Sequence, residues 1–377
     1  MVSEIRSFGI VGYIDLNFAK YIFIITQRQL VCRIRSKPVY RILGGDMLKI
    51  SKRFYTTLDE DDQERATYSS VLHMLGSGLL YYSPDWDLTT STQRTATERR
   101  KFPVDCDRRF FFNQFLLKPL LAHQAYDFVV PFICGFVGSK TLSVAGASGL
   151  VDVIVISRIS PQRAGTRTTR RGINVNGYAA IFCETETIVE NEGLLSSWVQ
   201  IRGSVPLLWK QSGLQSELKL ETSDAMTRVS LESMRKHFDQ LLSVYGDGDI
   251  TVIDIPDQYP ELGDLYSKAL WSAMWEFGRD EVKYVKHKFG DMERLKDLRV
   301  EMRRVLDKQS IFVMQNMENG LILQTQRGVV RTSDLDCVDE TNVVQFALAK
   351  DVLVKQLKAI GVLPVRFLGL IYIRSHF

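Results

Sequence analysis

Apolar and polar positions alternate in short runs through the first ~140 residues. Runs rich in β-branched and aromatic residues, separated by polar breaks, are typical of strands. They cover Phe8–Ile14, Lys20–Thr26, Gln29–Arg33 and Val39–Leu43. Apolar residues at helical spacing predict one helix over Gln63–Leu75. The polar stretch Thr90–Lys101 is predicted to be an exposed loop. This part of the chain is therefore expected to be sheet-rich.

The remaining residues mix buried-strand and helix patterns. Val151–Ile156 is a nearly continuous apolar run, as in a buried strand. Met292–Leu306 has the spacing of an amphipathic helix. We predict a mixed α/β protein with a sheet-rich N-terminal subdomain over residues 1–140. An α/β subdomain of catalytic type would follow over residues 141–377.

The stretch Gly328–Gln345 reads as a short strand, a polar turn and a helix. Thr341 and Asn342 are the expected caps of that helix. A turn that enters a helix N-terminus offers free backbone N–H groups and the positive end of the helix dipole. The sequence therefore predicts an anion cradle at this turn.

Composition limits the class of protein. The chain has 377 residues, 45% hydrophobic and 24% charged, which is ordinary for a globular protein. A net charge of +4 is too mild to indicate a nucleic-acid partner. The five cysteines are scattered without any C-x-x-C pair, so they predict neither a zinc site nor a disulfide framework, and a reducing compartment fits best.

Membrane segments are not indicated by the sequence. No secretory signal is recognisable at the N-terminus. The apolar runs Phe128–Val137 and Ile360–Ile373 are too short to cross a bilayer, and Arg366 interrupts the second. We expect no transmembrane span.

The stretch Gly328–Gln345 resembles the active-site loop of the Sac-domain phosphoinositide phosphatases, R-T-N-C-x-D-C-x-D-R-T-N-x-x-Q. The matching residues are Arg331, Thr332, Asp336, Cys337, Asp339, Thr341, Asn342 and Gln345. The two residues that carry the family's chemistry differ. The nucleophilic Cys falls on Asp334, and the phosphate-binding Arg falls on Glu340.

Two further stretches resemble the same family. Arg163–Ile173 is similar to its R-A-G-T-R…R-G-I-D motif, and Gln200–Trp209 is similar to Q-x-R-G-S-V-P-x-x-W. The first is the strongest basic cluster of the chain, and it reads either as a face for phosphate headgroups or as a salt-bridged turn.

The resemblance implies the site residues. The catalytic-type positions are Asp334 and Glu340, both substituted, with Asp336 and Asp339. The phosphate- or lipid-binding positions are Arg163, Arg167, Arg171, Arg331 and Thr341. No metal and no cofactor are expected. Replacing Arg by Glu changes the loop by two charges, and charges about 4 Å apart near a surface interact by roughly 4 kcal/mol. We therefore expect a loop that neither cleaves nor holds a phosphate well.

The letters of Asp334–Val338 also fit D-x-D-x-[VT], the aspartyl-nucleophile motif of haloacid-dehalogenase-like phosphatases. That motif needs an apolar strand leading directly into the first Asp, and Arg331–Ser333 intervene here. It also needs a downstream Lys and an acidic pair, and only 37 residues follow Glu340. This interpretation is disfavoured.

The resemblance spans Phe8 to Leu357, whereas Sac domains continue well beyond the loop, so the chain is expected to be a C-terminally truncated copy. The favoured hypothesis is a pseudophosphatase that binds phosphoinositide lipids or proteins. It would lie peripherally on cytoplasmic faces of endomembranes, at the endoplasmic reticulum, Golgi or plasma membrane. The alternatives are an active phosphatidylinositol monophosphate phosphatase with Asp334 as nucleophile, and a non-lipid scaffold or decayed copy.

Overall fold

The computed structural model describes residues 5–16, 19–52, 57–98, 100–144, 149–165, 170–191, 193–212, 219–246, 248–255, 260–278, 280–288, 290, 292–315 and 320–363. The chain separates into two compact units. The first comprises Met1–Ser139 with Ile154–Pro161, and the second comprises Lys140–Val153 with Gln162–Phe377. Each unit mixes strands and helices, so the predicted α/β class is confirmed.

The first unit is built on strands in the order β1-β2-β3-β4-β5, and each of these pairs is antiparallel. The strands are β1 (Ile10–Leu16), β2 (Ala19–Ile34), β3 (Lys37–Lys52), β4 (Leu80–Tyr82) and β5 (Ile133–Ser143). Arg35 and Ser36 join β2 to β3 with φ of 47° and 67°. Positive φ at both residues is the backbone of a type I′ turn, whose twist matches that of the flanking strands.

Strand β2 corrects the sequence interpretation. Lys20–Thr26 and Gln29–Arg33 were expected as separate strands, but they form one strand of 16 residues. The pairing register with β3 shifts on both sides of Gln27. A bulge of this kind changes which face the side chains point to, so the polar break in the pattern marks a bulge and not a strand end.

Helices of the first unit are α1 (Leu58–Gly76), α2 (Thr92–Glu98), α3 (Gln114–Ala122) and the 3-10 helix η1 (Tyr126–Phe128). Helix α2 shows that the predicted exposed loop over Thr90–Lys101 is wrong, because that segment is partly helical and Thr90 is buried. The reason is Asp87, whose carboxylate accepts hydrogen bonds of 2.6 Å from the hydroxyls of Thr89 and Thr90. Polar groups that pair with each other can be buried at little cost.

The second unit contains a sheet with the order β7-β8-β15-β11-β12, and β13 pairs both β8 and β14. Strands β8, β15, β11 and β12 run parallel, while β7 and β13 are antiparallel to β8. The strands are β7 (Cys183–Asn191), β8 (Leu194–Ser204), β11 (Ile250–Asp254), β12 (Val282–Lys286), β13 (Phe312–Gln315), β14 (Ile322–Gln324) and β15 (Val329–Asp334). Strands β5 and β6 (Leu150–Ile159) each have residues in both units, and β9 (Lys210–Ser212) pairs β10 (Lys219–Glu221).

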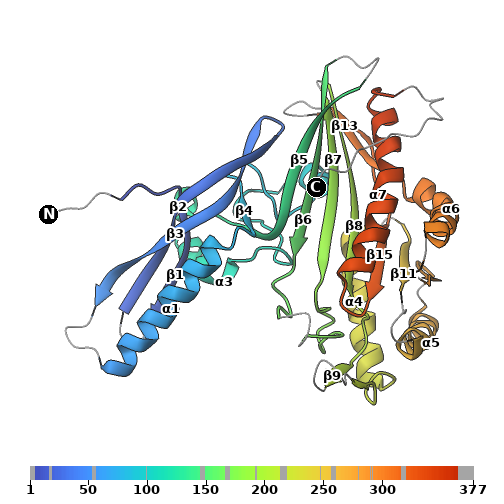
Figure 1. Cartoon of the computed structure of the whole chain (residues 1–377), viewed down its shortest axis with the longest axis horizontal. Helices are drawn as coiled ribbons and strands as arrows, with labels where there is room; N and C mark the ends of the chain where they lie inside the picture. The colour runs from blue at the N-terminus through green and yellow to red at the C-terminus, as the bar shows by residue number, and fades with distance from the viewer. Residues whose placement is uncertain are drawn as a thin grey trace. The chain divides into compact units, whose positions relative to one another are not determined.

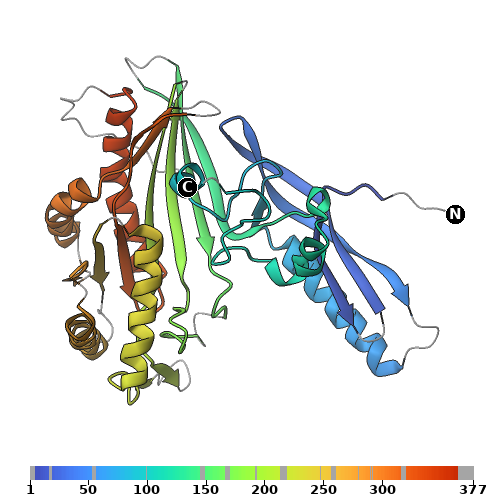
Figure 2. The ribbon, with the colours of Figure 1, turned by 180° about the vertical axis from the view of Figure 1, so that it is seen from behind.

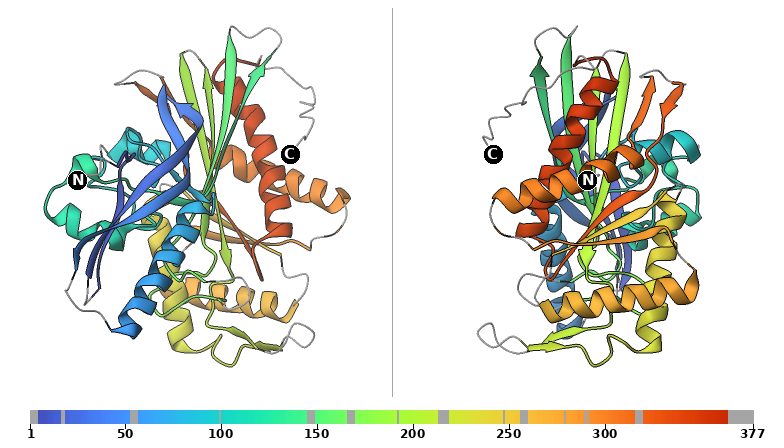
Figure 3. Two further views of the ribbon diagram at one scale, coloured as in Figure 1. Left: turned by 60° about the vertical axis from the view of Figure 1, so that its left-hand side comes forward. Right: turned by 90° about the vertical axis from the view of Figure 1, so that its right-hand side faces the viewer.

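Helices cover both faces of the parallel strands in the second unit. They are α4 (Arg228–Tyr245), α5 (Pro260–Phe277), α6 (Met292–Gln309) and α7 (Asp339–Ala359). Figures 1 and 2 show α7 in front of the strands in one view and α4 in front in the reverse view. The right-hand view of Figure 3 likewise places α7 and α4 on opposite sides of the strands. This covering explains why all six residues of β15 are buried.

Strand β15 and helix α7 meet at the predicted loop. The strand extends to Asp334, beyond the short apolar run that the sequence suggests. Helix α7 begins at Asp339, and its N-cap Val338 has no side-chain cap. The expectation of Thr341 or Asn342 as the cap is therefore wrong, because both lie inside the first turn. No helix in the described ranges is long and apolar enough to cross a bilayer.

Candidate functional site

The site lies where the carboxyl ends of three parallel strands meet. Asp334 at the end of β15 is in register with Ser204 at the end of β8. Its neighbour Ser333 is in register with Asp254 at the end of β11. In open α/β sheets this edge is the usual place for a ligand. The sheet order therefore gathers residues from three distant parts of the sequence.

The loop between β15 and α7 is held by its own acidic side chains. The Leu335 N–H donates to Asp334 Oδ1 at 2.6 Å, and the Val338 N–H donates to Asp336 Oδ1 at 3.2 Å. Cys337 adopts a φ of 55° and its thiol donates to the carbonyl of Asp334 at 3.4 Å. Two amides that would form part of an anion cradle are therefore already bound to carboxylates of the chain itself.

The acidic side chains are close together. Oxygens of Asp334, Asp336 and Glu340 all lie within 4.8 Å of one another. Burial raises the pKa of Asp334 to about 7, and the nearby negative charges of Glu340 and Asp336 add to the effect, while the bond from Leu335 N–H opposes it. The carboxyl at the family's nucleophile position thus keeps a proton to near neutral pH. A protonated carboxyl is a poor nucleophile.

Carboxylate oxygens at this spacing are also the ligands that Mg²⁺ and Ca²⁺ prefer. Within the described ranges, this is the one group of three His, Cys, Asp or Glu side chains close enough to hold a metal ion. The expectation of no metal stays a prediction, and the loop is the place to check it.

Arg331 lies beneath the loop and is fully buried. Its Nε donates to His237 Nε2 at 3.0 Å, one terminal nitrogen donates to the carbonyl of Ser204 at 2.9 Å, and the other donates to the hydroxyl of Ser333. These hydrogen bonds connect β15 to α4 and β8, so Arg331 has a structural role. The predicted contact of Arg331 with a headgroup stays untested, and burial makes a direct contact unfavourable.

Asp254 is a site residue that the sequence interpretation missed. It is buried and accepts a hydrogen bond of 2.6 Å from the hydroxyl of Tyr284. Burial raises the pKa of Asp254 to about 6, while the bond from Tyr284 opposes the rise. The signal in the sequence was the apolar run of β11 ending in an acidic residue, which is typical of a strand that leads into a site.

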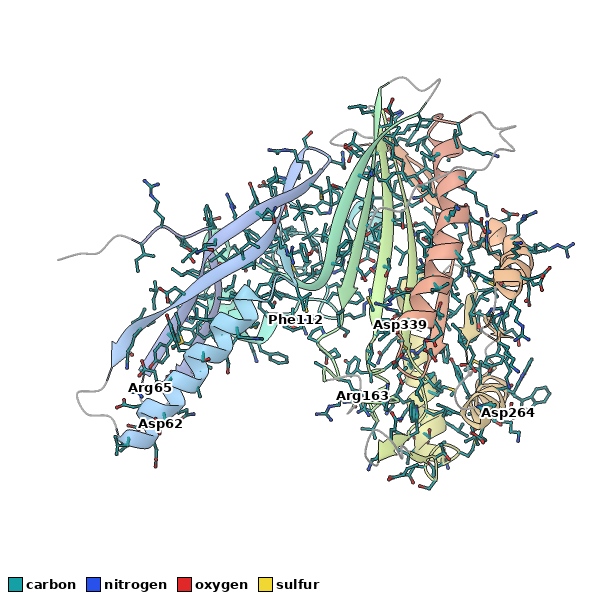
Figure 4. The ribbon with its side chains drawn as sticks, in the orientation of Figure 1. Asp62, Arg65, Phe112, Arg163, Asp264 and Asp339 are labelled. Atoms are coloured by element: carbon teal, nitrogen blue, oxygen red, sulfur yellow. The ribbon has the colours of Figure 1, made fainter. Side chains whose placement is uncertain are left out.

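Arginines lie beside the loop, as the resemblance implied. Arg171 donates to the carbonyl of Leu335 at 2.8 Å and to Gln211 Oε1 at 2.9 Å. Arg163 donates to the carbonyl of Arg171 at 2.7 Å. Figure 4 shows Arg163 toward the end of the unit where Asp339 begins α7. Arg167 lies outside the described residues.

Among the described residues, neither Arg163 nor Arg170 has a carboxylate partner. Burial lowers the pKa of Arg163, and the positive charge of Arg170 adds to the effect. The two like charges make this part of the cluster positively charged. The headgroup face and the salt-bridged turn both stay predictions.

The remaining predicted residues lie at the start of α7. Thr341 is fully buried, and its hydroxyl has no hydrogen-bond partner among the described residues. Asp339 is exposed in the first helical turn, where the helix dipole stabilises a negative charge. Arg202 of β8 donates to Asn342 and ties the helix to the strand. Among the predicted residues at the start of α7, only Glu340 belongs to the acidic group around Asp334.

Comparison with known proteins gives the family. The profile of the SacI homology domain matches residues 8–294. The chain belongs to this family. The Sac resemblance predicted from the loop is therefore confirmed, although that loop lies beyond the matched residues.

Several curated relatives are similar to nearly the whole chain. Phosphoinositide phosphatase SAC6 of Arabidopsis thaliana is 31% identical over 96% of this chain and 62% of its own length. Phosphatidylinositol-3-phosphatase SAC1-B of Danio rerio is 30% identical over 95% of this chain and 62% of its own length. Human synaptojanin-1 is 30% identical over 94% of this chain and 22% of its own length. The chain thus spans about three-fifths of the length of the two phosphatases.

Membership of the SacI homology family bears on the haloacid-dehalogenase alternative. Strand β15 leads directly into Asp334, but its last three residues before Asp334 are polar, so the strand is not the apolar one that the motif needs. The family match excludes it on stronger grounds, since the match covers most of the chain. The D-x-D-x-[VT] letters in the loop are a coincidence of the substituted Sac motif.

Proposed function

We propose that this SacI homology protein is a phosphoinositide-binding pseudophosphatase. The observation that carries the proposal is the loop itself. Asp334 and Asp336 accept hydrogen bonds from loop amides, and Glu340 lies within 4.8 Å of both. A phosphate would have to displace these bonds and approach acidic groups without the family's arginine. The loop therefore disfavours both binding of a phosphate for hydrolysis and stabilisation of the transferring phosphoryl group.

We assign binding of the lipid headgroup to the arginines beside the loop that joins β15 to α7. The guanidinium groups of Arg163 and Arg170, for which the described residues supply no carboxylate partner, provide positive charge there. Guanidinium groups suit phosphate because they donate paired hydrogen bonds. A lipid headgroup held by these residues would be bound without being cleaved. Peripheral contact with the cytoplasmic face of an endomembrane follows from this proposal and has the same test.

The first experiment measures phosphate release from short-chain phosphatidylinositol 4-phosphate. The purified chain is compared with the double variant Asp334→Cys, Glu340→Arg. We expect no release by the natural chain. Release by the double variant would show that the rest of the fold supports catalysis and that the substitutions at positions 334 and 340 alone remove the activity. Turnover by the natural chain that is lost in Asp334→Ala would overturn the proposal and assign Asp334 as a nucleophile.

The second experiment measures binding to vesicles that contain phosphatidylinositol 4-phosphate. The test variant is Arg163→Asn with Arg170→Ala, and Asn is chosen because Arg163 has a φ of 54° that Asn tolerates. Binding should weaken roughly tenfold or more, since each basic residue near an anionic surface contributes about 1 kcal/mol. Arg303→Ala on α6 removes an exposed arginine elsewhere and should bind as the natural chain does. Equal binding by all three proteins would refute the assigned site.

A further inference from the structure

Helix α5 exposes two tryptophans on one stripe. Trp271 is 70% exposed and Trp275 is 91% exposed. They are four residues apart and therefore neighbours on the helix surface. Tryptophan is costly to leave in water and is enriched at the centres of protein interfaces. Two such residues side by side point to a surface that is covered by a partner.

The tryptophans border a groove between α5 and strand β12. The groove has a volume of about 350 Å³. Its walls include Leu270, Trp271, Met274, Trp275, Val282 and Tyr284. We call this surface the tryptophan groove. A mostly aromatic and aliphatic wall offers space for apolar side chains of a partner.

Strand β12 is an edge of the sheet in the part of the chain that the structure describes. The Ile250 N–H donates to the carbonyl of Glu281, and the His287 N–H donates to the carbonyl of Asp254. Since these backbone groups alternate along a strand, those of Val282, Tyr284 and Lys286 point away from β11. A strand with free backbone groups is a template for another strand.

We propose that the tryptophan groove and the β12 edge pair with a second copy of this chain. The two copies would be related by a twofold axis near Tyr284, with their β12 strands antiparallel. The tryptophans of each copy would pack against the groove of the other. Such an isologous contact needs a surface that is complementary to itself.

Charge favours a second copy as the occupant. The exposed charged residues that flank the groove and its strand are Asp264, Lys268, Glu276, Asp280, Glu281, Lys283, Lys286 and Lys288. Acidic and basic residues are equal in number, so the rim selects neither a basic nor an acidic partner. Antiparallel pairing centred on Tyr284 places position 280 of one copy opposite position 288 of the other, so Asp280 would meet Lys288 across the interface. Figure 4 shows Asp264 on α5, and its carboxylate pairs with Lys286 of β12 at 2.6 Å.

The exposed tryptophans account for about half of the area that a stable dimer needs. A tryptophan buries about 150–250 Å². At the observed exposures, four tryptophans from two copies supply about 600 Å², half of the ~1,200 Å² at the lower limit for a stable interface. The groove walls and the paired strands would contribute the rest.

Sedimentation velocity of the purified chain over a wide concentration range tests the proposal. We expect a reversible dimer, with a dissociation constant raised at least about tenfold in Trp271→Ser, Trp275→Ser. Val300→Ser on α6 removes a side chain that is 63% exposed and should leave the dimer unchanged. Val282→Pro removes an outward N–H at the first residue of an edge strand, where proline is tolerated, and should weaken the dimer independently.

Circular dichroism and urea midpoints of each variant report whether it folds. A natural chain that stays monomeric throughout would overturn the proposal. A folded tryptophan variant that dimerises as tightly as the natural chain would do the same. Loss of vesicle binding in the tryptophan variant, with the natural chain monomeric, would assign the groove to a lipid surface and overturn the second-copy proposal.

Discussion

Arg331 and His237 form a buried pair in which the histidine is neutral. Arg331 Nε donates to His237 Nε2 at 3.0 Å, and the other ring nitrogen of His237 lies 2.8 Å from the carbonyl of Gly177. Arginine can only donate, so Nε2 accepts and Nδ1 carries the proton. Burial lowers the pKa of His237 to about 3, and the charge of Arg331 adds to the effect. The histidine is thus a fixed acceptor that helps to accommodate a buried cation.

Replacing that acceptor should destabilise the second unit. In His237→Ala, Arg331 would keep its charge but lose a hydrogen-bond partner in a buried site. We expect a loss of about 2–4 kcal/mol in the free energy of unfolding, measured by urea titration. His73→Ala on the surface of α1 should change the value by less than about 0.5 kcal/mol. An unchanged midpoint in His237→Ala would show that another group satisfies Arg331.

Asp334→Asn should stabilise the folded chain at neutral and alkaline pH. The pKa of Asp334 is raised to about 7 in the fold, while an unfolded aspartate titrates near about 3.9. Between these values the folded state holds a proton that the unfolded state has released. The contribution of Asp334 to stability therefore falls as the pH rises through this window and is constant above it.

The expected gain for Asp334→Asn is roughly 2–4 kcal/mol above pH ~7, disappearing near pH ~4. Urea titrations at several pH values measure it. Asp339→Asn changes an exposed carboxylate of the same segment and should give no such gain.

If Asp334→Asn instead destabilises the chain and a chelator does the same to the natural chain, the carboxylates hold a cation and the expectation of no metal is wrong.

Cys337 should be inert in the folded protein. It is buried, and burial raises the pKa of its thiol to about 12, with a further contribution from the charge of Asp334. Thiolate is the reactive form, so alkylation near pH ~8 should be very slow. Mass spectrometry after a short iodoacetamide pulse should find Cys32, which is partly exposed, labelled well before Cys337. Rapid labelling of Cys337 in the native chain would contradict the loop geometry.

Arg171 should hold the loop in place. Its guanidinium joins the carbonyl of Leu335 to the side chain of Gln211. Arg171→Lys keeps the charge but cannot reproduce the planar double donor. We expect a loss of about 1–3 kcal/mol in unfolding free energy by urea titration. Arg303→Lys on α6 is the matched exchange at an exposed position and should be neutral within about 0.5 kcal/mol.

The sequence by itself determined the family and the substitutions at its Cys and Arg positions. Residue types at fixed spacing are visible without a structure, and so Asp334 and Glu340 could be placed at the family's Cys and Arg positions. Local patterns also gave the class of fold, the helix of α6 and the buried strand of β6. These features depend on neighbouring residues only, which is why the sequence suffices for them.

Tertiary structure decided what surrounds those residues. Asp254 lies 80 positions before Asp334 in the printed sequence, and only the parallel pairing of β11 with β15 brings it to the site. One hydrogen-bond partner of Arg331 is His237 on α4, which no local pattern indicates. The raised pKa of Asp334 depends on burial and on nearby charges, and both are set by the fold. Long-range pairing and desolvation are properties of the folded chain, so the sequence named the candidate residues and the structure determined their environment.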